Sequence, residues 1–319
     1  MAGGFEALLS PVILFFVLGA AAAFARSDLS VPEALAKGMS LYLMAAIGLK
    51  GGVQVAESGF TSDMLAAACA GLALSFLIPL PAFLALRTYG RLNAVNAAAV
   101  AAHYGSVSVV TFVTGAEVLT SGGLPPAGYM VAVLALMETP AIVVGLWLAR
   151  RGGGAAEQSR SDLLHETLLN GSVVLLTGSF LIGLVAGKDG FAPIAPVFDT
   201  AFRGVLCLFL LDMGLVAARR LREARALTAR LAGLAVLFPL VNGTVGVVFA
   251  AAIGLDSGSA AALGILAASA SYIAVPAAMR LALPQADPGL YLAMSLAVTF
   301  PFNIVVGIPF YTFLAIGMT

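Results

Sequence analysis

Two short polar runs interrupt otherwise apolar stretches, and their residue types suit the binding of a small ion. Residues 103–108 (HYGSVS) bring together a ring nitrogen, a glycine and several hydroxyl groups, and residues 269–272 (SASY) carry two serines and a tyrosine. Pro276 follows the second run, and a proline removes a helix donor and disfavours helix just before it. We therefore expect both stretches to be helices that break at these runs.

If both helices break, the N-terminal ends of two half-helices can face each other across a small gap. Each end carries about half a positive charge and several free N–H groups, so the pair would form an anion site without a cationic side chain. Gly105 would let the backbone approach closely, and Ser106 and Ser271 would add hydroxyl donors. The pattern favours a small, compact oxyanion. The alternative is that these small residues only allow tight helix packing.

A cation site needs oxygen ligands, and the same breaks can supply them. Half-helix C-termini and unwound carbonyls provide some, and Ser108, Thr111 or Ser269 could add others. Glu138, beside Pro140, is a carboxylate inside a predicted membrane span. Such groups are costly in lipid and are functional by default, so Glu138 is the stronger of two candidate carboxylates.

Three further polar residues are weaker candidates. Asp212, the second carboxylate, lies near a basic loop and could simply pair with Arg219 or Arg220. His103 could titrate near neutrality, although a lone histidine in a span is more often a packed, hydrogen-bonding residue. Asn303 has the alternative role of hydrogen-bonding a neighbouring helix.

These residues must be positioned by membrane helices. Apolar residues make up 61% of the 319-residue chain and charged residues 10%, which excludes an ordinary soluble domain, and a β-barrel would show short alternating segments instead. Runs of roughly 20 apolar residues can each cross a bilayer as a helix. The runs predict an all-α integral membrane protein with about ten spans: 7–25, 31–49, 63–87, 93–121, 126–150, 165–187, 197–217, 228–254, 257–281 and 289–317.

The two halves of the chain resemble each other. Matching segments occur in the same order: residues 46–50 with 212–215, 101–106 with 267–272 (166 positions later), and 142–145 with 304–307. Each half holds five spans, so the second half must enter the membrane from the opposite face. This predicts a 5+5 inverted-topology repeat, which is typical of secondary transporters.

The distribution of charge predicts the topology. Of the 16 Lys and Arg residues, 13 lie in the loops after the odd-numbered spans, which places those loops in the cytoplasm and both termini in the periplasm of a bacterial inner membrane. We expect an N-terminal repeat over residues 1–150, a cytoplasmic linker over 151–163 and a C-terminal repeat over 164–319. Net charge is zero, so nothing indicates a nucleic-acid partner.

Several motifs resemble the signature of the SbtA-type sodium-dependent bicarbonate transporters. The most specific is AAHYGSVSVVTF at residues 101–112. The others are IGLKGG at 47–52, Met137-Glu138 with Pro140, and FPFN at 300–303 followed by GIP at 307–309. The resemblance covers essentially the whole chain.

The resemblance implies sodium-coupled bicarbonate uptake by a core domain that moves against a gate domain, with spans four and nine as crossing broken helices. It also implies a homotrimer and a cytosolic PII-like regulator. By resemblance the bicarbonate site falls on Tyr104, Gly105, Ser106, Val107, Ala270, Ser271 and Tyr272. The sodium ion, the coupling ion, is expected around Ser108, Thr111, Ser269 and Glu138.

Other functions remain open from the residues alone. The same architecture could carry another small anion, or exchange sodium for protons through Glu138. An intramembrane enzyme or a receptor is disfavoured, because the sequence shows no Ser–His–Asp, Cys–His or metal-ligand set. We therefore expect a transporter in the lipid bilayer and not an enzyme.

Overall fold

The computed structural model describes residues 10–151, 171–224 and 226–319, and this part of the chain contains no β-strand. Eight of its helical segments are long and apolar enough to cross a membrane, and each overlaps a predicted span. They are Glu33–Ser58, Ser62–Thr88, Ala94–Ser121, Met130–Arg151, Gly171–Ile194, Pro196–Glu223, Ala229–Ala252 and Pro288–Met318. Two shorter apolar helices, Pro11–Phe24 and Ser257–Ala268, overlap the other two predicted spans. The chain is therefore a multi-pass, helical membrane protein.

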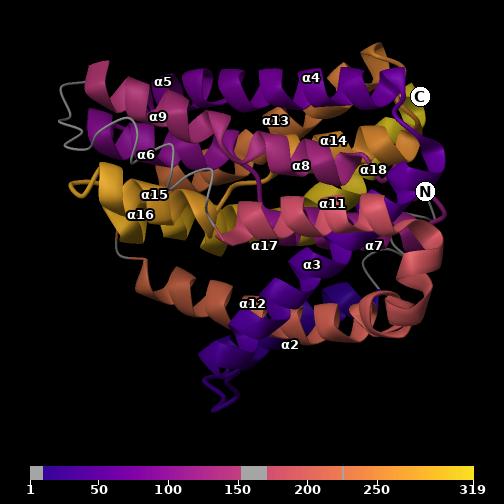
Figure 1. The fold of residues 1–319 in the computed structure, drawn as a ribbon. Helices are drawn as coiled ribbons and strands as arrows, with labels where there is room; N and C mark the ends of the chain where they lie inside the picture. Colours follow the sequence, from indigo (N-terminus) through magenta and orange to yellow (C-terminus); the bar gives the residue numbers. More distant parts are fainter. Residues whose placement is uncertain (1–9, 152–170, 225) are drawn as a thin grey trace.

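Many of these segments are divided into shorter helices. In chain order the elements are α2 (Pro11–Phe24), α3 (Glu33–Ser58), α4 (Ser62–Leu77), α5 (Pro79–Thr88), α6 (Ala94–Gly105), α7 (Val109–Ser121), α8 (Met130–Met137), α9 (Pro140–Arg151), α11 (Gly171–Phe191), η1 (Ala192–Ile194), η2 (Pro196–Thr200), α12 (Phe202–Glu223), α13 (Ala229–Ala252), α14 (Ser257–Ala268), α15 (Ala274–Ala282), α16 (Pro288–Leu292), η3 (Ala293–Thr299), α17 (Phe300–Phe302), η4 (Asn303–Gly307) and α18 (Ile308–Met318) (Figure 1).

Side-chain caps determine where several of these helices begin. Thr61, Asn93, Thr228 and Asp256 each accept a hydrogen bond from a backbone N–H in the first turn of α4, α6, α13 and α14. A cap of this kind satisfies an N–H group that has no partner inside the helix. The caps therefore determine the residue at which each helix begins, since alanine-rich helix interiors do not favour one starting residue over the next.

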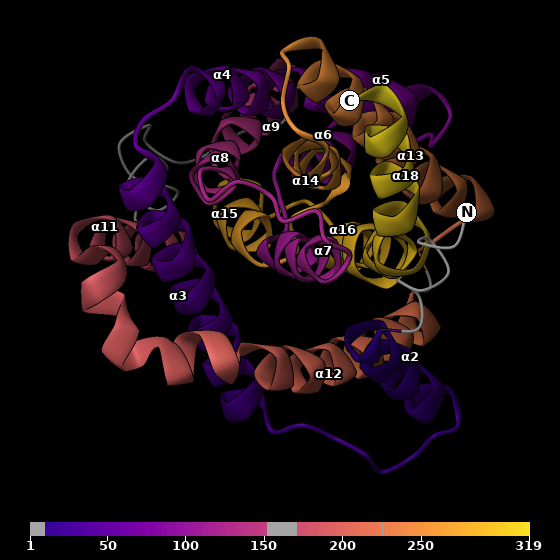
Figure 2. The same ribbon diagram turned by 90° about the vertical axis from the view of Figure 1, so that its right-hand side faces the viewer.

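The helices fall into two groups. Figure 2 shows α2, α3, α11 and α12 along the lower and left edge of the molecule, with α6, α7, α14 and α15 near its centre. We call α2, α3, α11 and α12, with η1 and η2, the four-helix group, and the remaining helices the central group. Within the four-helix group α3 packs along α11 and α2 packs along α12. The span that contains α6 and α7 is buried except near its two ends.

Glycines allow both pairs of the four-helix group to pack backbone against backbone. A Cβ added to Gly19 of α2 would collide with the Leu211 carbonyl of α12, and one added to Gly214 of α12 would collide with the Phe16 carbonyl of α2. Gly52 and Gly183 make the equivalent reciprocal contacts between α3 and α11. Small residues permit such close approach in lipid, where packing drives helix association.

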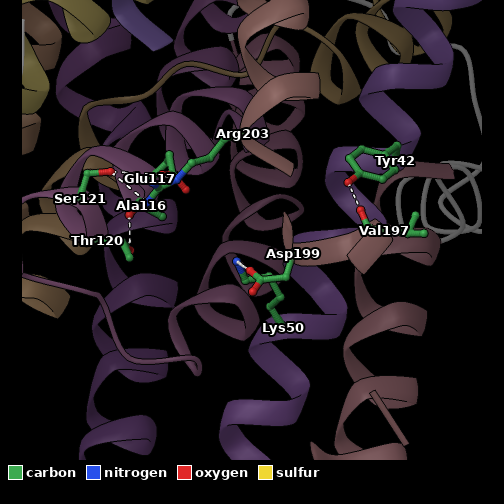
Figure 3. Close-up of polar contacts among 9 residues, drawn as sticks. All are labelled: Tyr42, Lys50, Ala116, Glu117, Thr120, Ser121, Val197, Asp199 and Arg203. Carbon is green, nitrogen blue, oxygen red and sulfur yellow. Dashed lines mark hydrogen bonds and ion pairs between the residues drawn. The ribbon is translucent and has the colours of Figure 1, made fainter. Parts of the chain in front are cut away.

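Two predicted helix ends are wrong. Span seven was expected to end at residue 217, but α12 continues to Glu223. Span two was expected to end near residue 49, with Lys50 in the following loop, but α3 continues to Ser58 and ends at the left-handed Gly59. Lys50 is tolerated inside the helix because its amine donates to Asp199 Oδ1 at 2.6 Å (Figure 3). The same amine lies 5.1 Å from the centre of the Phe202 ring. The predicted linker beyond Arg151, and the first residues of the spans predicted at 7–25 and 165–187, lie outside the described residues.

Candidate ion-binding site

The two polar runs interrupt their helices in the structure. The first break separates α6, which ends at Gly105, from α7, which begins at Val109. The second separates α14, which ends at Ala268, from α15, which begins at Ala274. Both breaks are buried in the central group, except for Ile273 at the end of the second break, which is 44% exposed.

The two breaks are hydrogen-bonded to each other. The Ser108 N–H donates to Ser269 Oγ, and the Ser271 N–H donates to the His103 carbonyl, each at 2.9 Å. The Ser269 hydroxyl in turn donates to the Leu266 carbonyl near the end of α14 at 2.8 Å. Unwound backbone is tolerated at membrane depth only where the protein satisfies its polar groups, and these bonds meet that requirement.

Serine hydroxyls also satisfy the start of each second half-helix. Ser108 Oγ accepts from the Thr111 N–H at 3.2 Å in the first turn of α7, and Ser271 Oγ accepts from the Val275 N–H at 3.3 Å in α15. A hydroxyl that accepts such a bond still has its own hydrogen to donate. Both serines can therefore cap a helix and donate to an anion at the same time.

A third break adjoins the first and was not predicted. Residues 138 and 139 separate α8 from α9, and the Ile142 N–H bonds the Thr139 carbonyl at 3.1 Å, which leaves the Glu138 carbonyl without its usual helical partner. Ser106 Oγ donates to that carbonyl at 2.9 Å. Pro140 was the sequence signal for this break, because proline lacks the N–H that continues a helix.

The breaks border a small pocket, which is lined by residues expected to bind the anion and by residues expected to bind sodium. Its lining consists of Val107, Ser108, Val109, Glu138, Ser172, Ser271, Tyr272, Ile273 and Ala274, and its volume is about 10 Å³, roughly room for one water molecule. The Glu138 side chain is 3% exposed, and no described residue donates a hydrogen bond to its Oε2 atom. A buried polar atom of this kind is expected to have a partner, so the pocket presents an oxygen ligand suited to a small cation.

Five of the residues expected from the sequence line this pocket: Val107, Ser108, Glu138, Ser271 and Tyr272. The others, Tyr104, Gly105, Ser106, Thr111, Ser269 and Ala270, are buried around it but do not line it. A Cβ on Gly105 would collide with the Pro79 ring and lie 2.9 Å from Ala141 Cβ. In this conformation Gly105 therefore serves close packing against Pro79 and Ala141.

The Tyr104 hydroxyl is the first member of a hydrogen-bond chain that ends at a backbone carbonyl. Thr299 Oγ1 donates to the Ala235 carbonyl at 2.6 Å and lies 2.7 Å from the Tyr104 hydroxyl, which must then be the donor to Thr299. Pro239 lies four residues after Ala235 inside α13 and has no N–H to donate. Thr299 thus replaces the missing helical donor. This role of Thr299 was not predicted, although Pro239 is a sequence signal for an unpaired carbonyl in α13.

The three weaker candidates make contacts elsewhere. His103 Nδ1 lies 2.6 Å from the Ala99 carbonyl and its ring stacks on Tyr291, with ring centres 4.5 Å apart, whereas Asn303 Nδ2 donates to the Ala268 carbonyl at the end of α14 at 2.8 Å. Asp212 lies buried in α12 and interacts electrostatically with Arg219.

The residues to which Asp212 was expected to pair have their own partners as well. Arg219 donates to the Leu29 carbonyl at 2.8 Å, and Arg220 lies 3.7 Å from Glu223. None of His103, Asn303 and Asp212 lines the pocket.

A family model described as the Na+-dependent bicarbonate transporter superfamily matches residues 11–316, which is nearly the whole chain. No curated protein matches the sequence. The matched range includes every residue of the pocket and both groups of helices.

Proposed function

We propose a mechanism on one premise: the chain belongs to the Na+-dependent bicarbonate transporter superfamily. It imports bicarbonate together with sodium by alternating access. The observation that supports this best is the pocket itself, where two broken helices meet beside a buried carboxylate oxygen to which no described residue donates a hydrogen bond. Membership in a transporter family also implies that the protein is not an enzyme.

The anion site uses the starts of α7 and α15. Both half-helices direct their N-terminal ends toward the breaks, where N–H groups and partial positive charge favour an anion. Val107, Ser271 and Tyr272 already line the pocket, and the Ser108 and Ser271 hydroxyls each have a hydrogen to donate. Of the remaining residues proposed for bicarbonate, Tyr104, Gly105, Ser106 and Ala270 hold the two breaks in place.

The sodium site adjoins the anion site through Glu138. Glu138 and Ser108 line the same pocket, and the oxygen ligands of their side chains suit a hard cation. Thr111 and Ser269 support this side through their bonds to Ser108. Sodium and the two helix ends place positive charge around one anion, so that each ion stabilises the binding of the other.

The pocket in this conformation is too small for bicarbonate, so the helices around it must move. A volume of about 10 Å³ holds roughly one water molecule. We propose that the four-helix group is the gate and that the central group is the core that carries both ions. Packing between the two groups is the contact that changes during transport.

Reciprocal packing supports an inverted repeat of five spans in each half, over residues 1–150 and 164–319 with a linker over 151–163. An exchange of the halves would convert the α2–α12 pair into the α11–α3 pair, and both pairs use glycine on each helix. The caps Asn93 and Asp256 are 163 positions apart, as are Ser108 and Ser271. The offset of 166 expected from the alanine-rich segments is therefore three residues out of register.

One ion pair joins the two groups on the side where α7 ends and α12 begins. Arg203 Nε contacts Glu117 Oε1, and Arg203 Nη2 donates to Ser121 Oγ at 3.3 Å (Figure 3). The other ion pairs of residues 10–151, 171–224 and 226–319 lie within the four-helix group. We call the Glu117–Arg203 contact the outer latch and propose that it closes the periplasmic side.

The further expectations are proposals, of which the first two rest on the family resemblance and the last two on the distribution of Lys and Arg. They are a homotrimer, a PII-like regulator on the cytoplasmic face, a bacterial inner membrane and periplasmic termini. Cross-linking of the purified protein in lipid tests the first of these.

Uptake into proteoliposomes tests the main proposal. Labelled bicarbonate should accumulate under an inward sodium gradient and not under an equal potassium gradient. Displacement of bicarbonate by formate or another small carboxylate would instead indicate a different anion.

The buried Glu138 also fits a sodium/proton exchanger. That function would appear as sodium-driven proton flux in the absence of bicarbonate, measured with a pH-sensitive dye inside the vesicles.

A further inference from the structure

A groove between the ends of α5 and α9 combines two arginines with aromatic and apolar side chains. It has a volume of about 260 Å³ and is lined by Phe83, Arg87, Ala94, Trp147, Leu148 and Arg151. We propose that this groove binds the headgroup of an anionic phospholipid, whose phosphate lies between the guanidinium groups of Arg87 and Arg151. The described residues of its lining include two arginines and no carboxylate, so their charge is complementary to a phosphate.

Both arginines are held at the groove. Arg87 Nη1 donates to the Leu92 carbonyl at 2.9 Å, and the Arg151 guanidinium lies over the Trp147 ring, 4.1 Å from its centre. A guanidinium has five N–H donors and matches phosphate geometry with paired bonds. Ala94 belongs to the first turn of α6, whose N-terminus adds partial positive charge to the same groove.

Along each of the two helices, apolar residues come before an arginine, in the same order as the acyl chains and headgroup of a lipid. On α5, Leu80 and Leu84 precede Arg87 on one helical face, and on α9, Val143 and Trp147 precede Arg151 with a spacing of four.

The apolar members of both stripes are exposed, with Leu84 63% and Val143 47% exposed. They can line acyl chains in the bilayer. Tryptophan is enriched at membrane interfaces, so Trp147 lies at the depth of a headgroup.

The side of the membrane also fits an anionic lipid. The C-terminal ends of α5 and α9 lie on the side where most Lys and Arg residues occur, which the charge rule assigns to the cytoplasm. Anionic lipids give the cytoplasmic leaflet its negative surface potential, and basic pockets between helices on that side bind lipid headgroups.

Trp147 is the chain's single tryptophan, so its fluorescence reports directly on the groove. The full-length protein in nanodiscs is titrated with dibrominated phosphatidylglycerol or dibrominated phosphatidylcholine, because bromine quenches a nearby tryptophan. The anionic lipid should reach half-maximal quenching at a lower mole fraction than phosphatidylcholine. Each arginine should contribute a factor of roughly five to this difference. R87Q/R151Q should lose this preference, R87K/R151K should keep part of it, and R220Q, an exposed arginine on α12, should keep all of it.

The ratio of the two lipids is compared within each variant, so a change in fluorescence yield does not affect the result. The same emission maximum and a single gel-filtration peak show that each variant is folded. Equal quenching by both lipids, or a preference that survives R87Q/R151Q, would overturn the proposal. So would displacement of the anionic lipid by inorganic phosphate, or a complete lack of quenching, which would mean that a second copy of the chain covers this face.

Discussion

Substitution of Glu117 by glutamine should open the periplasmic side of the protein more often. Glu117 lies on α7 and is buried, whereas Arg203 lies in the first turn of α12. Glu117 Oε1 also accepts from Ser121 Oγ at 3.2 Å. Removal of the charge therefore weakens the one ion pair that joins the two helix groups in the described part of the chain.

The free energy lost on breaking the Glu117–Arg203 ion pair depends on how far its two side chains are exposed to solvent. The side chain of Glu117 is 9% exposed and that of Arg203 is 61% exposed. Exposed pairs contribute about 0.2–1 kcal/mol, and loss of one partner of a fully buried pair costs about 3–5 kcal/mol. An intermediate value of about 1–2 kcal/mol corresponds to a shift of roughly 5- to 30-fold in the equilibrium between closed and open forms.

A native cysteine reports on this equilibrium. Cys207 lines a pocket of about 210 Å³ that also contains Glu117, Ser121 and Arg203. The assay measures the rate at which a membrane-impermeant maleimide labels Cys207 from the outside, in a background where the exposed Cys69 is replaced by serine. Glu117→Gln should raise this rate by about the calculated factor.

Two comparisons make the assay specific. Lys50→Gln breaks an ion pair that lies entirely within the four-helix group, so it should leave the labelling rate unchanged. Glu117→Gln combined with Arg203→Gln should add little to the single substitution, because both remove the same contact. A wild-type labelling rate in Glu117→Gln, or equal acceleration by Lys50→Gln, would refute the latch.

Two further substitutions separate direct contacts from structural ones. Ser271→Ala should raise the KM for bicarbonate several-fold, because Ser271 lines the pocket. Ser106→Ala should mainly lower the free energy of unfolding, by about 1 kcal/mol, because its hydroxyl donates to the Glu138 carbonyl. Transport kinetics and thermal unfolding of both variants check this, and the reverse pattern would contradict it. Thr299→Val should cost about 1–3 kcal/mol by leaving the Ala235 carbonyl without a donor. In a Pro239→Ala background, which restores the helical N–H, the same substitution should cost clearly less, and an unchanged cost in the denaturation midpoint would show that Thr299 acts otherwise.

The positions of two of the three helix breaks were predicted from the sequence, because they depend on local chemistry. Glycine and serine at residues 103–108 and the proline after residues 269–272 weaken helix at those points, and the chain breaks there. Apolar length likewise gave the approximate extent of the eight long membrane segments. Lys50 misled the prediction because a charge usually marks a span end, and only the tertiary contact with Asp199 compensates it.

The assignment of individual side chains depended on tertiary structure. Ser106 was expected to face an anion, but its hydroxyl donates to a carbonyl that the α8–α9 break exposes. Glu117 was not predicted as a site residue, because a carboxylate near a span end usually faces water and its partner Arg203 lies in the other half of the chain. Contacts of this kind join residues far apart in sequence and leave no local pattern.

The sodium dependence of bicarbonate uptake, compared between the wild type and Glu138→Gln in proteoliposomes, tests the central claim most directly. The pocket joins the Glu138 carboxylate to the two broken helices, so the wild type should require sodium and saturate with it. Glu138→Gln should shift half-saturation to a sodium concentration at least tenfold higher. Sodium-independent uptake by the wild type, or an unchanged sodium curve in Glu138→Gln, would contradict the account.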